Sequence, residues 1–372
     1  MEQTSSAAYP NILAVDYIKK ARVANPQLLM KCEQFLNIGY QKLLTFERPG
    51  GGFDWWGNSE PLVWLSAYGL QEFADMAKVY PIDRGIITRT QAFLMKKMDP
   101  DGTWSNIGAT HGETIANMGN PKLLLTSYVV WSLVESGYDK AQLAKSVAYI
   151  RSHLGDANEN AYILALAANA LASVDPKDGA TLEAVKMLEK QRRDVKEWRA
   201  SVYPSKATSL AYSRGDGISV ETTALAALAM LKTGQFTNSV NESLTYLVKA
   251  KGNGHWGSTQ ATILALKALV AGMGGAPVDK AYPFAIKLNG KEVARGKVDP
   301  ENSDVMQTFD LKEHTKPGDN LVEIDMQGET SLMYQIVARH FQPWKETTPK
   351  QPVVNVDVAY DRTQLSTSDQ TT

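Results

Sequence analysis

The sequence has little cysteine and no long hydrophobic run. Cys32 is the single cysteine among 372 residues, so no disulfide can form within the chain. This indicates either a protein of a reducing compartment or one that is stabilised by core packing alone. No apolar stretch is long enough to cross a bilayer. The N-terminus also lacks the basic and then apolar pattern of a signal peptide.

The chain also lacks an excess of charge of either sign. Its formal net charge is −1, with 44% hydrophobic and 21% charged residues, which are values typical of globular proteins. We see no electrostatic reason to expect nucleic acid or an anionic membrane as a partner. Four histidines are scattered without ligand spacing, namely His153, His255, His314 and His340. We therefore expect no metal and no cofactor.

Helical periodicity extends from about residue 10 to residue 273. The segments that it predicts as helical are 12–18, 28–44, 61–76, 86–98, 123–134, 161–171, 220–231 and 263–270. Turns rich in glycine and tryptophan lie between some of them, at 50–57, 101–104 and 252–257. A unit of two helices and a turn, repeated about every fifty residues, indicates stacked helical hairpins.

Several of these segments are apolar on more than one face, as in Ala224–Ala229. A helix of this kind belongs in the middle of a layered helical structure. This favours an inner ring of helices inside an outer ring. We therefore predict a mainly α fold, an α/α toroid of helical hairpins, over residues 1–274.

The period changes to two after Gly274-Gly275. Asn289-Gly290 is a strong hairpin turn between the alternating runs 284–288 and 292–298. Further strands are predicted at 306–311, 321–326 and 332–338. We expect a small antiparallel β unit over residues 275–345, followed by a polar tail over residues 346–372.

The first seventeen residues carry a recognisable motif. Glu2-Gln3 is followed by Pro10-Asn11 and Asp16-Tyr17, and the segment 256–269 has the pattern of a closing helix. Over residues 1 to about 273 the chain resembles the thioester-containing domain of the alpha-2-macroglobulin and complement family. The family motif reads Cys-x-Glu-Gln, with the cysteine thiol bonded to the glutamine acyl carbon. Met1 corresponds to the x position, and the cysteine that should precede it is missing from this chain.

The resemblance implies a role for each motif residue. Gln3 would be the acyl residue of the thioester, and Glu2 would be the motif glutamate beside it. Cys32 lies in Cys-Glu-Gln without the spacer residue, and its apolar neighbours predict a packed cysteine and not the nucleophile. A buried, aromatic-lined site would keep water from the thioester. Tyr9, Tyr68 and the Trp55-Trp56 pair are candidates for that lining, although aromatic residues at turns between helices more often serve core packing.

His111 stands in His-Gly-Glu, with Glu113 two residues later. In complement-like members a histidine in a similar setting attacks the thioester and forms an acyl-imidazole, which then transfers the acyl group to hydroxyls. The resemblance gives His111 this role, and Glu113 would orient it. From the residues alone, a loop histidine bonded to the backbone and an exposed glutamate at a helix start are the other readings.

The resemblance also implies the wider context. The chain would be a non-enzymatic domain that captures target proteases or hydroxyl-bearing surfaces covalently, beside macroglobulin-type domains of a longer parent. Segment 275–345 would be the returning half of a CUB-like domain, and segment 346–372 the start of a macroglobulin-type domain. The low cysteine count favours a bacterial-type member, extracellular or associated with the periplasm or cell envelope.

Two other functions stay open at this point. If no cysteine precedes Met1 in the complete protein, the toroid would be a binding or scaffolding module without a thioester. A terpene cyclase or prenyltransferase toroid is the third reading. It needs clustered aspartates, or zinc ligands that include cysteine, and the predicted helices carry neither.

Overall fold

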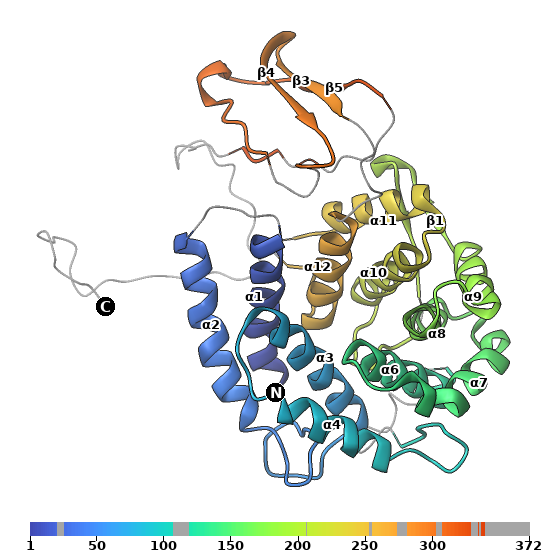
Figure 1. Cartoon of the computed structure of the whole chain (residues 1–372). Coiled ribbons are helices and arrows are strands. Elements are labelled where there is room, and N and C mark those ends of the chain that lie inside the picture. The colour runs from blue at the N-terminus through green and yellow to red at the C-terminus, as the bar shows by residue number, and fades with distance from the viewer. Residues whose placement is uncertain are drawn as a thin grey trace, which may run out of the picture. The chain divides into compact units, whose positions relative to one another are not determined.

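A computed structural model describes most of the chain, and the fold is given for those residues. They are 1–20, 26–106, 119–205, 207–252, 255–273, 281–302, 307–328, 334 and 336–338. In this described part, eleven α-helices lie between residues 2 and 273, and a small antiparallel sheet follows (Figure 1). The predicted order of a helical region and then a β unit is confirmed.

Six helices form a closed inner ring in which each helix contacts the next, and α12 returns to contact α1. They are α1 (Glu2–Lys20), α3 (Val63–Val79), α6 (Pro121–Glu135), α8 (Ala161–Val174), α10 (Asp216–Thr233) and α12 (Thr259–Met273). Of these helices, α3, α6, α8 and α10 are buried on almost every side, whereas α1 and α12 are partly exposed. In α8, for example, every residue from Ala161 to Ala172 is buried. Such helices need neighbours on both faces, which the ring and an outer layer provide.

Five helices pack outside the ring, each against the inner helix that precedes it in the chain. They are α2 (Pro26–Leu44), α4 (Gly85–Lys96), α7 (Ala144–Ser152), α9 (Gly179–Glu189) and α11 (Thr237–Lys249). Their apolar residues lie on one face, as Val240, Leu244 and Leu247 do in α11. This alternation of inner and outer helices is the predicted α/α toroid.

The turns that lead into α3, α6, α10 and α12 share one hydrogen bond. A buried aromatic residue stands in the turn, and its backbone N–H donates to a Ser or Thr hydroxyl of the following inner helix. The four pairs are Phe53 with Ser66 (2.8 Å), Trp104 with Thr126 (3.1 Å), Tyr203 with Thr223 (3.0 Å) and Trp256 with Thr262 (3.2 Å). The Trp104 and Trp256 indoles also donate to the Leu94 and Leu247 carbonyls, near the ends of α4 and α11. The Trp104 and Trp256 turns therefore fasten α6 and α12 to the outer helices before them.

The later sheet has the strand order β4-β3-β5, formed by β3 (Tyr282–Leu288), β4 (Lys291–Val298) and β5 (Val322–Met326). The predicted Asn289-Gly290 turn is confirmed, because both residues have positive φ, as a type I′ hairpin requires. The short hairpin of β1 (Arg193–Val195) and β2 (Ala200–Val202) was not predicted.

Two of the strands predicted from the sequence are not found among the described residues. Residues 307–311 form no strand, so that prediction is wrong. Asp310 accepts the Lys312 N–H (2.9 Å) at the start of a short 3₁₀ turn, and this local hydrogen bond competes with strand pairing. Of the segment 332–338, the described residues 334 and 336–338 lie outside any strand. The tail 346–372 lies outside the described residues.

One polar network includes a side chain from every inner helix. Its centre is Lys267 of α12, whose Nζ lies 2.7 Å from Asp75 Oδ2 of α3 and 3.3 Å from Gln71 Oε1. The other members are Tyr9, which donates to Asp75 (2.8 Å), Ser132, which accepts from Gln71 (2.9 Å), and the group of Lys232, Glu135 and Ser173 (2.5–2.7 Å). Lys232 and Lys267 both lie over the Trp131 ring, 5.6 and 5.9 Å from its centroid. The network thus joins helices that are far apart in the sequence.

Lys267→Met should destabilise the ring. Although burial opposes the effect, the Lys267 and Lys78 ammonium groups hold the pKa of Asp75 well below its usual range. Removing Lys267 leaves the Asp75 carboxylate, whose side chain is only 18% exposed, without its main partner, which costs about 3 kcal/mol or more of unfolding free energy. Urea denaturation at neutral pH measures the loss.

Lys78→Met is the matched control, because Lys78 bonds the same carboxylate at 2.8 Å but has a side chain 54% exposed. An exposed pair is worth about 1 kcal/mol or less. Equal losses in the two variants would show that the buried pair has no special part in holding the ring.

Candidate functional site

The first turn of α1 carries Glu2-Gln3 and is fixed at both ends. The Met1 nitrogen donates to the Trp55 carbonyl at 2.7 Å, and Ser5 N–H donates to the Met1 carbonyl at 3.0 Å. The Met1 side chain is buried, and its ε-methyl lies so close to α3 that a Cβ on Gly69 would approach it to 2.7 Å. Glu2 is half-buried and Gln3 is exposed. The backbone of this turn is therefore held in place, and the Gln3 side chain is exposed to solvent.

The loop beneath Met1 is organised by Asp54. This carboxylate is 1% exposed and accepts backbone N–H groups from residues 56 to 59, among them those of Trp56 (2.7 Å) and Asn58 (2.9 Å). Burial opposes ionisation of Asp54, but the four hydrogen bonds outweigh it and lower the pKa. The loop is also close-packed at Gly57, where φ is 81° and a Cβ would collide with the Thr45 carbonyl. The Trp55 carbonyl, which accepts the hydrogen bond from the Met1 nitrogen, is thus part of a rigid loop.

A buried polar cluster lies behind the first turn. The Ser5 hydroxyl is hydrogen-bonded to the Tyr68 hydroxyl and donates to Glu72 Oε2 at 2.7 Å. Ser5 and Glu72 are 0% exposed, and Glu72 Oε1 has no hydrogen-bond partner. Burial raises the pKa of Glu72 to about 8, against the opposing effects of the Ser5 hydrogen bond and the Lys267 charge. Glu72 is therefore mostly a neutral acid at pH 7.

A second buried carboxyl, Glu221 of α10, faces the same end of α1. Ser258 donates to its Oε1 at 3.4 Å, and Ser213 donates to Ser258 at 3.1 Å. Burial raises the pKa of Glu221 to about 7 against these serine hydrogen bonds, and the negative charge of Glu2 raises it further. The first turn of α1, which carries Glu2, thus lies near three buried carboxyl groups, those of Asp54, Glu72 and Glu221.

The aromatic residues named from the sequence have different surroundings. Tyr9 and Tyr68 are buried between α1 and α3, with ring centroids 6.0 Å apart. The Trp55 ring packs edge-on against Trp64 at 5.2 Å. Trp56 is 77% exposed and is held on the Asp54 loop. Of these aromatic side chains, only Trp56 is largely open to solvent beside the first turn.

Cys32 is buried in α2 and is a free thiol, as predicted. Burial raises its pKa, against the effect of the Lys31 charge, so the thiol stays protonated and is a poor nucleophile. In the part of the chain that the structure describes, no group of three His, Cys, Asp or Glu side chains is arranged to hold a metal ion. Nor does any described helix combine the length and the apolar character that a membrane crossing requires.

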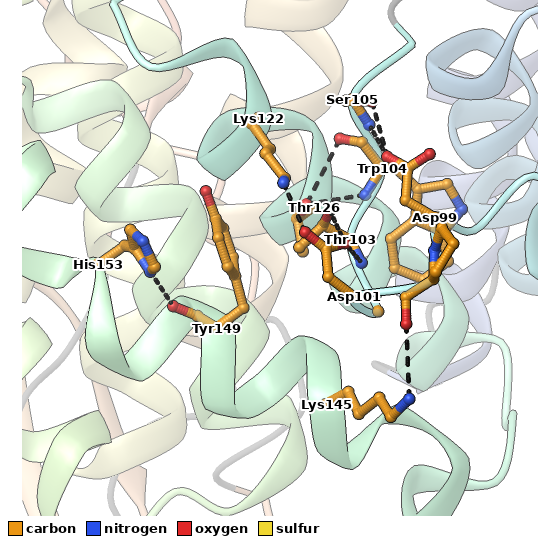
Figure 2. Close-up of polar contacts among 12 residues, drawn as sticks. Asp99, Asp101, Thr103, Trp104, Ser105, Lys122, Thr126, Lys145, Tyr149 and His153 are labelled. Atoms are coloured by element: carbon orange, nitrogen blue, oxygen red, sulfur yellow. Dashed lines mark hydrogen bonds and ion pairs between the residues drawn. The ribbon is translucent and has the colours of Figure 1, made fainter.

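His111 and Glu113 lie outside the described residues, in the gap 107–118. Both flanks of the gap are anchored at the start of α6, as Figure 2 shows. On one side, Trp104 bonds Thr126, and the Ser105 hydroxyl donates to Asp99 at 2.6 Å. On the other side, Asn120 accepts the Leu123 N–H (3.0 Å), and Lys122 pairs with Asp101 at 2.6 Å. The described residues on either side of the gap therefore both have contacts at the N-terminal part of α6.

Sequence reasoning missed Ser5, Glu72 and Glu221. A signal for Glu72 was present, because Gln71-Glu72 interrupts the mostly apolar run from Val63 to Ala74. Ser5 lies four residues before Tyr9 and hence on the same helical face. Their partnership depends on the packing of α1 against α3, which no local pattern specifies.

Glu72→Gln should change how stability depends on pH. The folded-state pKa of Glu72, about 8, lies above the ordinary value of 4.5, so the folded protein binds the proton more tightly. Its contribution to stability therefore falls as pH rises through this interval. The groups that face it are Ser5 and the α-amino group from the start of the chain, Tyr68 and Asp75 from α3, and Lys267 from α12.

Chemical denaturation at several pH values from 4 to 9 tests this expectation. The free energy of unfolding should fall less steeply with pH in Glu72→Gln than in the unmodified protein, so that the variant gains relative stability at pH 8. Parallel curves would mean that Glu72 does not titrate in this interval. Glu221→Gln is the matched comparison, with its effect ending nearer pH 7.

The sequence of the chain is similar to those of known proteins. A family model described as the A-macroglobulin TED domain matches residues 1–271. Ovostatin of Gallus gallus is 24% identical over 353 residues, covering 90% of this chain and 24% of that protein. Thioester-containing protein 1 allele R1 of Anopheles gambiae is 26% identical over 328 residues, covering 85% of this chain and 23% of that protein.

The chain thus spans about a quarter of the length of these relatives. The family model covers the whole inner ring except the last two residues of α12. It includes the Glu2-Gln3 turn, the Trp104 turn and the closing helix. On this match, the chain belongs to the A-macroglobulin TED domain family.

Proposed function

We propose that this chain captures its target covalently, through a thioester between Gln3 and a cysteine bonded directly to the Met1 nitrogen. The observation that carries the proposal is the first turn of α1. Residues three apart lie on one face of a helix, so a cysteine at that place and Gln3 are neighbours. The Trp55 carbonyl fixes the Met1 nitrogen at 2.7 Å, and Gln3 is exposed. The two reacting side chains would start from a rigid base.

The bond would form by attack of the cysteine thiolate on the Gln3 amide carbon. The carbon–nitrogen bond breaks, the thiol proton and the amide nitrogen leave as ammonia, and the acyl carbon stays bonded to sulfur. This activated acyl group reacts readily with nucleophiles, so it needs shelter from water. Trp56 is exposed on the rigid Asp54 loop beside this turn. Once the Trp56 ring is covered, it would supply part of that shelter.

We assign the acyl transfer to His111, with Glu113 as its orienting partner and Glu2 as the motif residue beside Gln3. The neutral imidazole attacks the acyl carbon and releases the cysteine thiolate. The thiolate then takes the proton of an incoming hydroxyl, whose oxygen displaces the imidazole and forms an ester. On either side of residues 107–118, Trp104 and Asn120 are hydrogen-bonded to α6.

The targets would be proteases or hydroxyl-bearing surface molecules, captured once per domain and without turnover. Because the matched relatives are about four times longer, we propose macroglobulin-type neighbours for this domain, residues 1–274. Segment 275–345 would be the returning half of a CUB-like domain, and segment 346–372 the start of the next domain. The single buried cysteine supports a bacterial-type protein that acts extracellularly or at the cell envelope.

The thioester is tested on the chain with one cysteine added before Met1. Its intact mass should be about 17 Da below that of the thiol-amide form, through loss of ammonia. Methylamine should then add to the protein and release one thiol. Gln3→Ala is the control, and it should show neither change. An unmodified mass and an inert thiol count would contradict the thioester and leave a non-covalent binding module.

His111→Asn tests the acyl transfer in the same cysteine-bearing chain. Removing the imidazole should shift capture from hydroxyls to amines, because an amine can attack the thioester directly. Labelled glycerol and labelled methylamine, offered together, measure the preference. His153→Asn is the control, since His153 is bonded to the Tyr149 carbonyl at 2.9 Å and lies on α7's C-terminal end. An unchanged ratio in His111→Asn would reject the assigned role.

A further inference from the structure

The interface between α1 and α3 has two polar layers, one helical turn apart. In the first layer, Ser5 Oγ donates to Glu72 Oε2 at 2.7 Å and also bonds the Tyr68 hydroxyl. In the second, the Tyr9 hydroxyl donates to Asp75 Oδ2 at 2.8 Å. Each layer thus joins a hydroxyl of α1 to a carboxyl group of α3. The layers differ in what surrounds the carboxyl group.

The second layer is balanced by positive charge. Asp75 lies 2.7 Å from Lys267 Nζ and 2.8 Å from Lys78 Nζ, so its negative charge is neutralised in place. Tyr9 adds one more hydrogen bond to a carboxylate that already has two partners. Loss of the Tyr9 hydroxyl would leave Asp75 well bonded.

The first layer has no such balance. Glu72 is 0% exposed, is not within salt-bridge distance of any described cation, and has an unbonded Oε1. Burying a carboxyl group among apolar side chains costs stability, and an apolar residue of similar volume would serve the core better. Packing therefore explains poorly why Glu72 stands here. Its one strong hydrogen bond joins it to Ser5.

Ser5 is the residue at which the α1 hydrogen-bond ladder begins. Its N–H donates to the Met1 carbonyl at 3.0 Å, which closes the turn that contains Glu2 and Gln3. N–H groups before it have no partner within the helix, so this turn is the one most prone to fray. A side-chain anchor at Ser5 opposes fraying where Gln3 must be held.

We propose that Glu72 is a positioning residue for the thioester, acting through Ser5 to fix the first turn of α1 and the direction of the Gln3 side chain. This inference rests on the proposed function of Gln3. Tyr68 is the second half of the anchor, since its hydroxyl bonds Ser5 as well. An acyl carbon and a thiol held at a fixed separation react far faster than the same groups on a frayed turn.

The first test needs no thioester and uses the chain as it stands. Hydrogen–deuterium exchange of the amides at residues 5–8 reports the order of the first turn. Ser5→Ala and Glu72→Leu should raise these exchange rates about tenfold or more, while amides of α8 stay protected. Glu72→Gln can still accept from Ser5 and should exchange like the unmodified chain.

Tyr9→Phe is the matched control, because it deletes the equivalent hydroxyl of the second layer. It should leave exchange at residues 5–8 unchanged. An equal rise in Tyr9→Phe, or no rise in Ser5→Ala, would overturn the positioning role. Failure of Glu72→Leu to fold does not affect the result, since Ser5→Ala removes the same bond with a small change.

The second test measures function in the chain with a cysteine added before Met1. Ser5→Ala should lower the rate of thioester formation, or raise its spontaneous hydrolysis, about tenfold, whereas Glu72→Gln and Tyr9→Phe should match the unmodified chain. Unchanged rates in Ser5→Ala would reject the proposal. If the unmodified chain forms no thioester at all, the proposed function fails, and the exchange result alone decides whether Glu72 anchors the turn.

Discussion

The position of α1 in the ring is the constraint on which the site depends. α1 contacts α3 on one side and α12 on the other, so it is the helix at which the ring closes. Its two polar layers bind it to α3, and Lys267 of α12 reaches the second layer through Asp75. If α1 moved out of the ring, Gln3 and the Met1 nitrogen would lose their fixed places together.

The charged groups of the ring are distributed unevenly. Asp75, Lys267, Lys232 and Glu135 compensate one another in a network that includes every inner helix. At the start of α1, by contrast, Glu72 and Glu221 are buried and form no ion pair with any described side chain, and burial raises the pKa of both. A protein tolerates such a cost most readily where function requires it. The two carboxyl groups without ion pairs, Glu72 and Glu221, lie at the Glu2-Gln3 turn, to which we assign the function.

The helical architecture could be predicted from the sequence because its signals are local. Apolar periodicity gives the inner helices, and the alanine-rich runs show that they are buried on two sides. Asn289-Gly290 specifies its hairpin by backbone conformation alone. Cys32 was recognisable as a packed thiol from its apolar neighbours. In each case the physical cause lies within a few residues of the feature.

The site could be predicted only in part, because its contacts join distant segments. Ser5 meets Glu72, and Met1 meets Trp55, only after α1 and α3 have packed. The predicted strand at 306–311 failed for the opposite reason, since a local Asp310 hydrogen bond prevailed over an alternating pattern. The roles of Gln3 and His111 came from resemblance and stay predictions.

The central claim is that the first turn of α1 holds an acyl glutamine beside a cysteine. A crystal structure of the chain with a cysteine added before Met1 tests it most directly. We predict continuous electron density from the cysteine Sγ to Gln3 Cδ, with the Met1 nitrogen still bonded to the Trp55 carbonyl. A free thiol beside an intact Gln3 carboxamide, in a turn otherwise unchanged, would contradict the account.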